Sequence, residues 1–187
     1  MAGRAGRLRN GRPLVLEHGE DLFGTSRFLM AGASAGANLA LATFQRLRER
    51  GHADRMAGVV LQFGAYDLSG QTPGGRLYAD EYFIQAYAGH VTDRSNPDAS
   101  PIFADLGGMP PALVIVGALD ILLEDNLAMA ARLSAAGSHV DVRVFPESPH
   151  GFTSHPTSMA TAAWADIASW ADGMLTHASE SDFHGGC

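Results

Sequence analysis

Lysine is missing from this 187-residue chain, and its thirteen basic residues are all arginines. The chain therefore cannot form a lysine Schiff base, a serine–lysine dyad or a lysine-containing phosphate loop. Cysteine occurs once, as Cys187, which excludes an internal disulfide and a cysteine-rich zinc site. No apolar run approaches the roughly 18–20 residues of a membrane span, and none follows the N-terminal arginines as in a secretory signal. These absences predict a cytoplasmic protein without a membrane span.

The chain has fewer basic than acidic groups, thirteen against twenty, and its formal net charge is −7. A general nucleic-acid binder needs a surplus of positive charge, so this function is disfavoured. Apolar residues make up 46% of the chain and charged residues 18%, a composition that can bury a core. The length suits one domain of ordinary size.

Apolar strand patterns alternate with helical patterns along the chain, which predicts an α/β fold with a mostly parallel sheet and flanking helices. The expected strands cover residues 28–31, 58–63, 112–116 and 140–145, and the expected helices cover residues 36–50, 124–136 and 157–176. The strand at 140–145 alternates valines with Asp141 and Arg143, as a strand at the edge of a sheet does. We assign residues 25–178 to this domain.

Three segments depart from the alternating pattern. Residues 1–24 are rich in arginine and glycine and predict a basic, poorly ordered segment, and residues 179–187 predict a polar tail. Between the second and third strands, residues 70–100 form an insertion that is expected to make a lid or pocket wall. Its aromatic residues Tyr82, Phe83 and Tyr87 fit two roles, lining a substrate pocket or packing on the core.

The segment Gly32–Gly36 matches the G-x-S-x-G pattern, with Ser34 at its centre. An expected buried strand precedes it and an expected helix follows, the context that defines a nucleophile elbow. In such a turn the serine hydroxyl projects above the sheet, and the N–H of Ala35 points into the same space. An incidental serine in a glycine-rich turn fits less well. A dinucleotide-binding loop is disfavoured because G-x-G-x-x-G needs glycine where Ser34 stands.

A serine nucleophile needs a base and an orienting acid, which in this fold follow it in the order acid, then histidine, beyond the ends of strands. Asp120 follows the strand at 112–116, and His150 follows the strand at 140–145. We therefore predict a Ser34–His150–Asp120 triad. Asp67 is the rival acid, although it fits better as a turn cap, and His155 is the rival base. No histidine spacing suggests a metal ligand set, so no metal and no cofactor are expected.

These motifs together resemble the hormone-sensitive-lipase-like carboxylesterases of the α/β-hydrolase superfamily. Gly32–Gly36 stands where that family has G-D-S-A-G, Asp120 begins a segment similar to its D-P-L, and His150 begins H-G-F. Residues 95–101 and 106–112 are similar to the family's approach to the acid strand, so the resemblance covers roughly residues 27–175. It implies that residues 25–178 are the C-terminal part of an α/β-hydrolase domain, a partial α/β-hydrolase fold, and that the protein hydrolyses carboxylic esters through an acyl-enzyme.

The resemblance also implies an H-G-G-G motif well before the serine, which completes the oxyanion hole, and this motif is absent from the 33 residues before Ser34. His18–Asp21 is no substitute, being acidic and too close to Ser34. Two explanations stay open, a truncated product or gene model and a divergent short form. The strand at 28–31 would then leave an apolar sheet edge, which predicts a homodimer or pairing with a missing N-terminal polypeptide.

The function predicted from these residues is that of a serine carboxylesterase acting on small-molecule esters with short to medium acyl chains. Ser34 is the nucleophile, His150 the base, Asp120 the orienting acid and Ala35 an oxyanion donor through its N–H. The alternative is a catalytically silent, hydrolase-like binding or regulatory module. The complete triad argues against this alternative, and the missing oxyanion motif argues for it.

Overall fold

A four-stranded parallel sheet forms the centre of the protein in the computed structural model, which describes residues 18–182. The strands lie in chain order: β1 (Phe28–Ala33), β2 (Met56–Gln62), β3 (Ala112–Gly117) and β4 (Val140–Phe145). The predicted α/β fold with a parallel sheet is confirmed, and each expected strand is present within a few residues of its expected limits.

The burial of each strand agrees with its position in the sheet. Every residue of β2 and β3 is buried, as expected for central strands of a parallel sheet that is covered on both faces. β4 is mostly half-buried or exposed and forms one edge, which confirms the expectation drawn from its alternating sequence. β1 forms the other edge of the described sheet, and none of its residues is fully buried.

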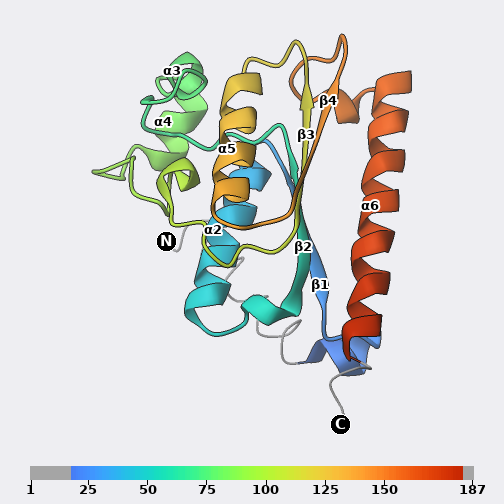
Figure 1. Cartoon of the computed structure of the whole chain (residues 1–187). Helices are drawn as coiled ribbons and strands as arrows, with labels where there is room; N and C mark the ends of the chain where they lie inside the picture. The colour runs from blue at the N-terminus through green and yellow to red at the C-terminus, as the bar shows by residue number, and fades with distance from the viewer. Residues whose placement is uncertain (1–17, 183–187) are drawn as a thin grey trace.

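Helices cover both faces of the sheet (Figure 1). α2 (Ala35–Glu49) and α5 (Leu123–Ala135) lie on one face and α6 (Ser158–Asp182) on the other. Because neighbouring side chains of a strand point to opposite faces, Leu61 of β2 packs in the core beneath α2 and α5, whereas Val60 packs in the core beneath α6.

The ends of the chain differ in part from expectation. Most of the basic segment expected over residues 1–24 lies outside the described residues, but residues 18–23 are helical. In the segment expected as a polar tail, residues 179–187, α6 continues to Asp182, and residues 183–187 lie outside the described part. In the described part, no helix combines the length and apolar character needed to cross a bilayer.

The insertion between β2 and β3 folds into α3 (Gly75–Tyr78), α4 (Tyr82–Ala88) and a short 3-10 turn at Pro101–Phe103 (η2). A second 3-10 turn, Ala53–Arg55 (η1), precedes β2, and a third, Phe152–Ser154 (η3), follows β4. Figure 1 shows α3 and α4 beside α5, near the end of the sheet where the strands point. In a parallel sheet this is the end at which ligands bind.

Two buried carboxylates hold the start of the insertion in place. Asp67 accepts hydrogen bonds from the N–H groups of Ser69 and Thr72 and from the Ser69 hydroxyl. Asp125, on α5, accepts from the Thr72 hydroxyl and from the N–H groups of Gly74 and Gly75. Burial by itself raises the pKa of Asp67, but the hydrogen bonds from Ser69 and Thr72 outweigh it, so the pKa lies below its usual value. Asp67 is therefore ionised at neutral pH.

Replacing Asp67 with asparagine should lower the free energy of unfolding at neutral pH by about 1–3 kcal/mol, because charge-assisted hydrogen bonds are lost. A lowered pKa stabilises the fold fully above the unfolded value of about 3.9 and loses this contribution as pH falls through the folded value. The difference between Asp67→Asn and the native chain should therefore shrink in acid, as measured by urea unfolding across that pH range.

The matched control is Asp93→Asn, because Asp93 also accepts from the N–H and hydroxyl of the serine two residues on, but is exposed. Its substitution should change stability little. An equal loss in both variants would contradict the structural role of Asp67.

Candidate active site

Ser34 lies in a sharp turn between β1 and α2, with φ 53° and ψ −119°. This conformation is rare and strained for a residue other than glycine. The turn is held because the Ser34 N–H donates to the Gln62 carbonyl at 2.9 Å, while its own carbonyl accepts from Ala37 at 3.0 Å. A Cβ on Gly32 would lie 2.2 Å from the Gly36 carbonyl oxygen, so only glycine permits this close crossing of strand and helix.

Three polar side chains form a continuous hydrogen-bonded series that starts at Ser34. Its hydroxyl oxygen lies 2.9 Å from Nε2 of His150, and Nδ1 of His150 lies 3.1 Å from each carboxylate oxygen of Asp120. If Nδ1–H donates to the carboxylate, Nε2 carries the lone pair that accepts the Ser34 proton. The structure thus brings together all three residues predicted for the triad.

The Asp120 carboxylate is well fixed, and the His150 ring is open to solvent on one side. The Asp120 side chain is fully buried, and it also accepts a hydrogen bond from the Leu122 N–H at 2.8 Å. The His150 side chain is 34% exposed, which leaves room for a ligand beside Ser34. A buried acceptor with a fixed direction holds the imidazole in one tautomer and one orientation.

The loop that carries His150 packs tightly against the ends of β2 and β3. A Cβ on Gly117 would lie 1.9 Å from the Ser148 carbonyl oxygen, so the loop can approach β3 only because residue 117 is glycine. The ring of Phe63 contacts that of His150 edge-on at 5.2 Å between centroids. The Thr153 hydroxyl donates to the buried Gln62 side chain at 3.0 Å. Sequence reasoning missed Phe63, Gly117 and Gln62, because none belongs to a motif and each acts through a contact with a distant segment.

The two rival residues lie elsewhere. Asp67 is engaged with Ser69 and Thr72 at the start of the insertion, which agrees with its expected preference for a turn. His155 is exposed in the loop between η3 and α6. Neither residue takes part in the hydrogen-bonded series of Ser34, His150 and Asp120.

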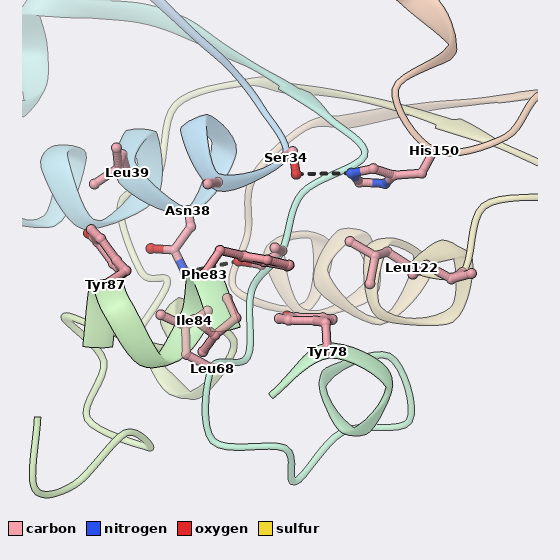
Figure 2. Close-up of a pocket in the computed structure, with 13 residues that line it drawn as sticks. Ser34, Asn38, Leu39, Leu68, Tyr78, Phe83, Ile84, Tyr87, Leu122 and His150 are labelled. Atoms are coloured by element: carbon pink, nitrogen blue, oxygen red, sulfur yellow. Dashed lines mark hydrogen bonds between the residues drawn. The ribbon is translucent and has the colours of Figure 1, made fainter. Parts of the chain in front are cut away.

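A pocket of about 360 Å³ opens beside Ser34 and His150, and most of its lining is apolar (Figure 2). α2, the insertion and the loop after β3 supply the wall, which consists of Ala35, Asn38, Leu39, Ala65, Leu68, Tyr78, Phe83, Ile84, Tyr87, Ile121 and Leu122. Of the two roles left open for the aromatic residues, Phe83 and Tyr87 take the first, because both line this pocket. Tyr82 takes neither role, because it is 85% exposed. Tyr78 of α3 is a further aromatic residue of the wall.

The N–H of Ala35 is the first of α2, and the first N–H groups of a helix have no acceptor within it. Ala35 also lines the pocket next to Ser34. Its N–H and the positive end of the helix dipole can therefore stabilise negative charge that develops on an oxygen bound beside Ser34.

Comparison with known proteins identifies a family and several relatives. A family model described as the alpha/beta hydrolase fold matches residues 13–154. The carboxylic ester hydrolase LipN of Mycobacterium tuberculosis is 31% identical over 152 residues, which are 73% of this chain and 40% of that protein. An esterase of Acinetobacter venetianus is 30% identical over 158 residues, 78% of this chain and 52% of the esterase.

Solved structures give the same result. A hormone-sensitive lipase from a metagenome library is 31% identical, with a TM-score of 0.69 over 79% of this chain and 53% of that one. An esterase of Pyrobaculum calidifontis is 28% identical, with a TM-score of 0.72 over 86% of this chain and 57% of that one. The chain thus spans about half the length of the relatives that it matches.

Replacing Gly117 with alanine should destabilise the protein by about 1–3 kcal/mol, as overpacking does, because the new methyl group would collide with the backbone of the His150 loop. The matched control is Gly173→Ala in α6, where a Cβ meets nothing within 4 Å. That change should leave stability unchanged or raise it by up to about 1 kcal/mol. Thermal unfolding compares the two, and equal melting temperatures would contradict the close contact at Gly117.

Proposed function

The chain belongs to the α/β-hydrolase-fold family, and we propose that it is a serine carboxylesterase. The observation that carries this proposal is the hydrogen-bonded series from Ser34 through His150 to Asp120, at the mouth of an apolar pocket. A nucleophile, a base in contact with it and an acid that orients the base are what ester hydrolysis requires. The esterase names of the relatives support the same reaction.

The proposed reaction proceeds through an acyl-enzyme. The Ser34 oxygen attacks the ester carbonyl carbon while Nε2 of His150 takes the hydroxyl proton, and the Asp120 carboxylate stabilises the imidazolium. His150 returns the proton to the leaving alcohol as the carbon–oxygen bond breaks. Water then attacks the acyl-enzyme, His150 takes its proton and passes it to Ser34, and the acid is released. Water is the second substrate, and no cofactor is proposed.

The oxyanion of each tetrahedral intermediate would accept a hydrogen bond from the Ala35 N–H. Among residues 18–182 we assign no second donor, and each donor of this kind is worth about 10²–10³-fold in rate. This observation favours the alternative function, a catalytically silent binding or regulatory module of the same fold. The two proposals differ in whether Ser34 is reactive.

The volume of the pocket sets the proposed substrate size. A cavity of about 360 Å³ with apolar walls lies at the small end of ligand pockets. We therefore propose esters with short to medium acyl chains. The cytoplasmic location expected from the sequence stays a prediction.

β1 offers one edge to a further strand within the described sheet. Its residues are half-buried or exposed, and the backbone groups on its outer side face away from β2. An edge of this kind pairs readily with another chain. We propose that β1 pairs with a second copy or with another polypeptide.

A fluorophosphonate probe should form one covalent adduct with the purified protein and none with Ser34→Ala, read by native mass spectrometry. The probe reacts only with a serine activated by its base, so labelling separates the esterase from the silent module. A folded native chain that stays unlabelled would overturn the esterase proposal. The same spectrum reports whether the protein is a monomer, and a stable monomer would contradict the proposed pairing of β1.

Asp120→Asn should lower kcat/KM for a para-nitrophenyl ester on the order of 10⁴-fold, because the imidazole loses the carboxylate that fixes its tautomer. Asp67→Asn is the matched control, since it changes a buried aspartate that does not contact His150. It should retain most of the activity at temperatures where it is folded. Loss of activity in Asp67→Asn but not in Asp120→Asn would reverse the assignment of the acid.

A further inference from the structure

Asn38 is a polar residue in the wall of the apolar pocket. It lies on α2 one helical turn after Ser34, and it is only 4% exposed. Its amide nitrogen donates both hydrogens, to the carbonyl of Ala65 at 2.9 Å and to the carbonyl of Ala99 at 2.9 Å. Two carbonyl acceptors on one nitrogen fix the orientation of the amide, because the flipped group would place an oxygen against both.

The amide oxygen of Asn38 is left for a ligand. It has no hydrogen-bond partner among the described residues, and Figure 2 shows it turned away from the bonded nitrogen, toward the side of the pocket where Tyr87 lies. Around it the wall is apolar, with Leu39, Phe83 and Ile84. A plain alkyl chain bound here would displace water from this oxygen and leave it unsatisfied, which is costly.

Asn38 and Ser34 line the same pocket, so an ester whose carbonyl group lies at Ser34 would extend along the wall that contains Asn38. A hydroxyl on that part of the ester could donate to Asn38 while the rest of the chain contacts the apolar wall.

Resting on the proposed esterase function, we infer that Asn38 selects esters whose acyl chain carries a hydrogen-bond donor, such as hydroxyacyl esters. Whether an added hydroxyl strengthens or weakens binding distinguishes this role of Asn38 from that of a wholly apolar wall. In a wholly apolar pocket an added hydroxyl would weaken binding about 10-fold or more, because it loses its bonds to water. Opposite a fixed acceptor, the hydroxyl should strengthen binding about 3- to 10-fold, as a net neutral hydrogen bond does.

The test measures binding to Ser34→Ala, so that it does not depend on turnover. Dissociation constants are compared by NMR titration for methyl butyrate, for its α- and β-hydroxy derivatives and for the matching α- and β-methoxy esters. A methoxy ester keeps the oxygen but has no hydrogen to donate. We expect a hydroxy ester to bind about 3- to 10-fold more tightly than methyl butyrate and than its methoxy counterpart. Equal or tighter binding of methyl butyrate, or no binding of any ester, would overturn the inference.

Two variants in the Ser34→Ala background assign the effect to one residue. Adding Asn38→Leu should abolish the preference for the hydroxy ester, and adding Tyr87→Phe should keep it, because the Tyr87 hydroxyl is the other polar group on that side of the pocket. Loss of the preference in Tyr87→Phe but not in Asn38→Leu would overturn the role of Asn38. Hydrolysis of the same esters by the native chain tests the esterase function separately, so the two failures are distinguishable.

Discussion

Where β1 runs into α2, glycine at position 32 lets the strand and the helix cross at a distance that no side chain would allow. This close crossing places Ser34 in a strained turn, with its hydroxyl toward His150 and the free N–H of Ala35 beside it. The Ser34 N–H donates a hydrogen bond to the carbonyl of Gln62 in β2, so the sheet stabilises the strained conformation of the turn. The proposed nucleophile, the proposed oxyanion donor and the start of the pocket wall all depend on this one junction.

Buried carboxylates in the same region serve different purposes because their partners differ. Asp120 faces an imidazole and one backbone N–H, so its carboxylate is placed to orient the ring of His150. Asp67 and Asp125 accept mainly from N–H and hydroxyl groups of residues 69–75, so both carboxylates hold that loop in place. The loop leads directly into α3, which brings Tyr78 to the pocket. Hydrogen bonds to buried carboxylates therefore hold the pocket wall as well as the proposed triad in place.

The insertion and α2 give the pocket a mostly apolar wall, in which Asn38 is a buried polar residue. The amide of this residue joins α2 to the loop after β2 and to the end of the insertion, so it holds the wall near Ser34. The same geometry turns its oxygen toward the space that a substrate would fill. Asn38 therefore holds the pocket wall in place and also presents a hydrogen-bond acceptor to the pocket.

The sequence by itself determined the order and type of the main elements, because strands buried on both faces and amphipathic helices have different periodicities. It also determined the candidate triad, since Ser34, Asp120 and His150 each follow a recognisable strand pattern. Tertiary structure decided what periodicity does not encode: that Tyr78 and not Tyr82 faces the pocket, and that α6 continues past the expected start of the tail. The contacts of Gly117 with Ser148, of Gln62 with Thr153 and of Asn38 with Ala65 and Ala99 join segments far apart in the chain. Such contacts exist only after the sheet has brought the ends of its strands together, so no local pattern could reveal them.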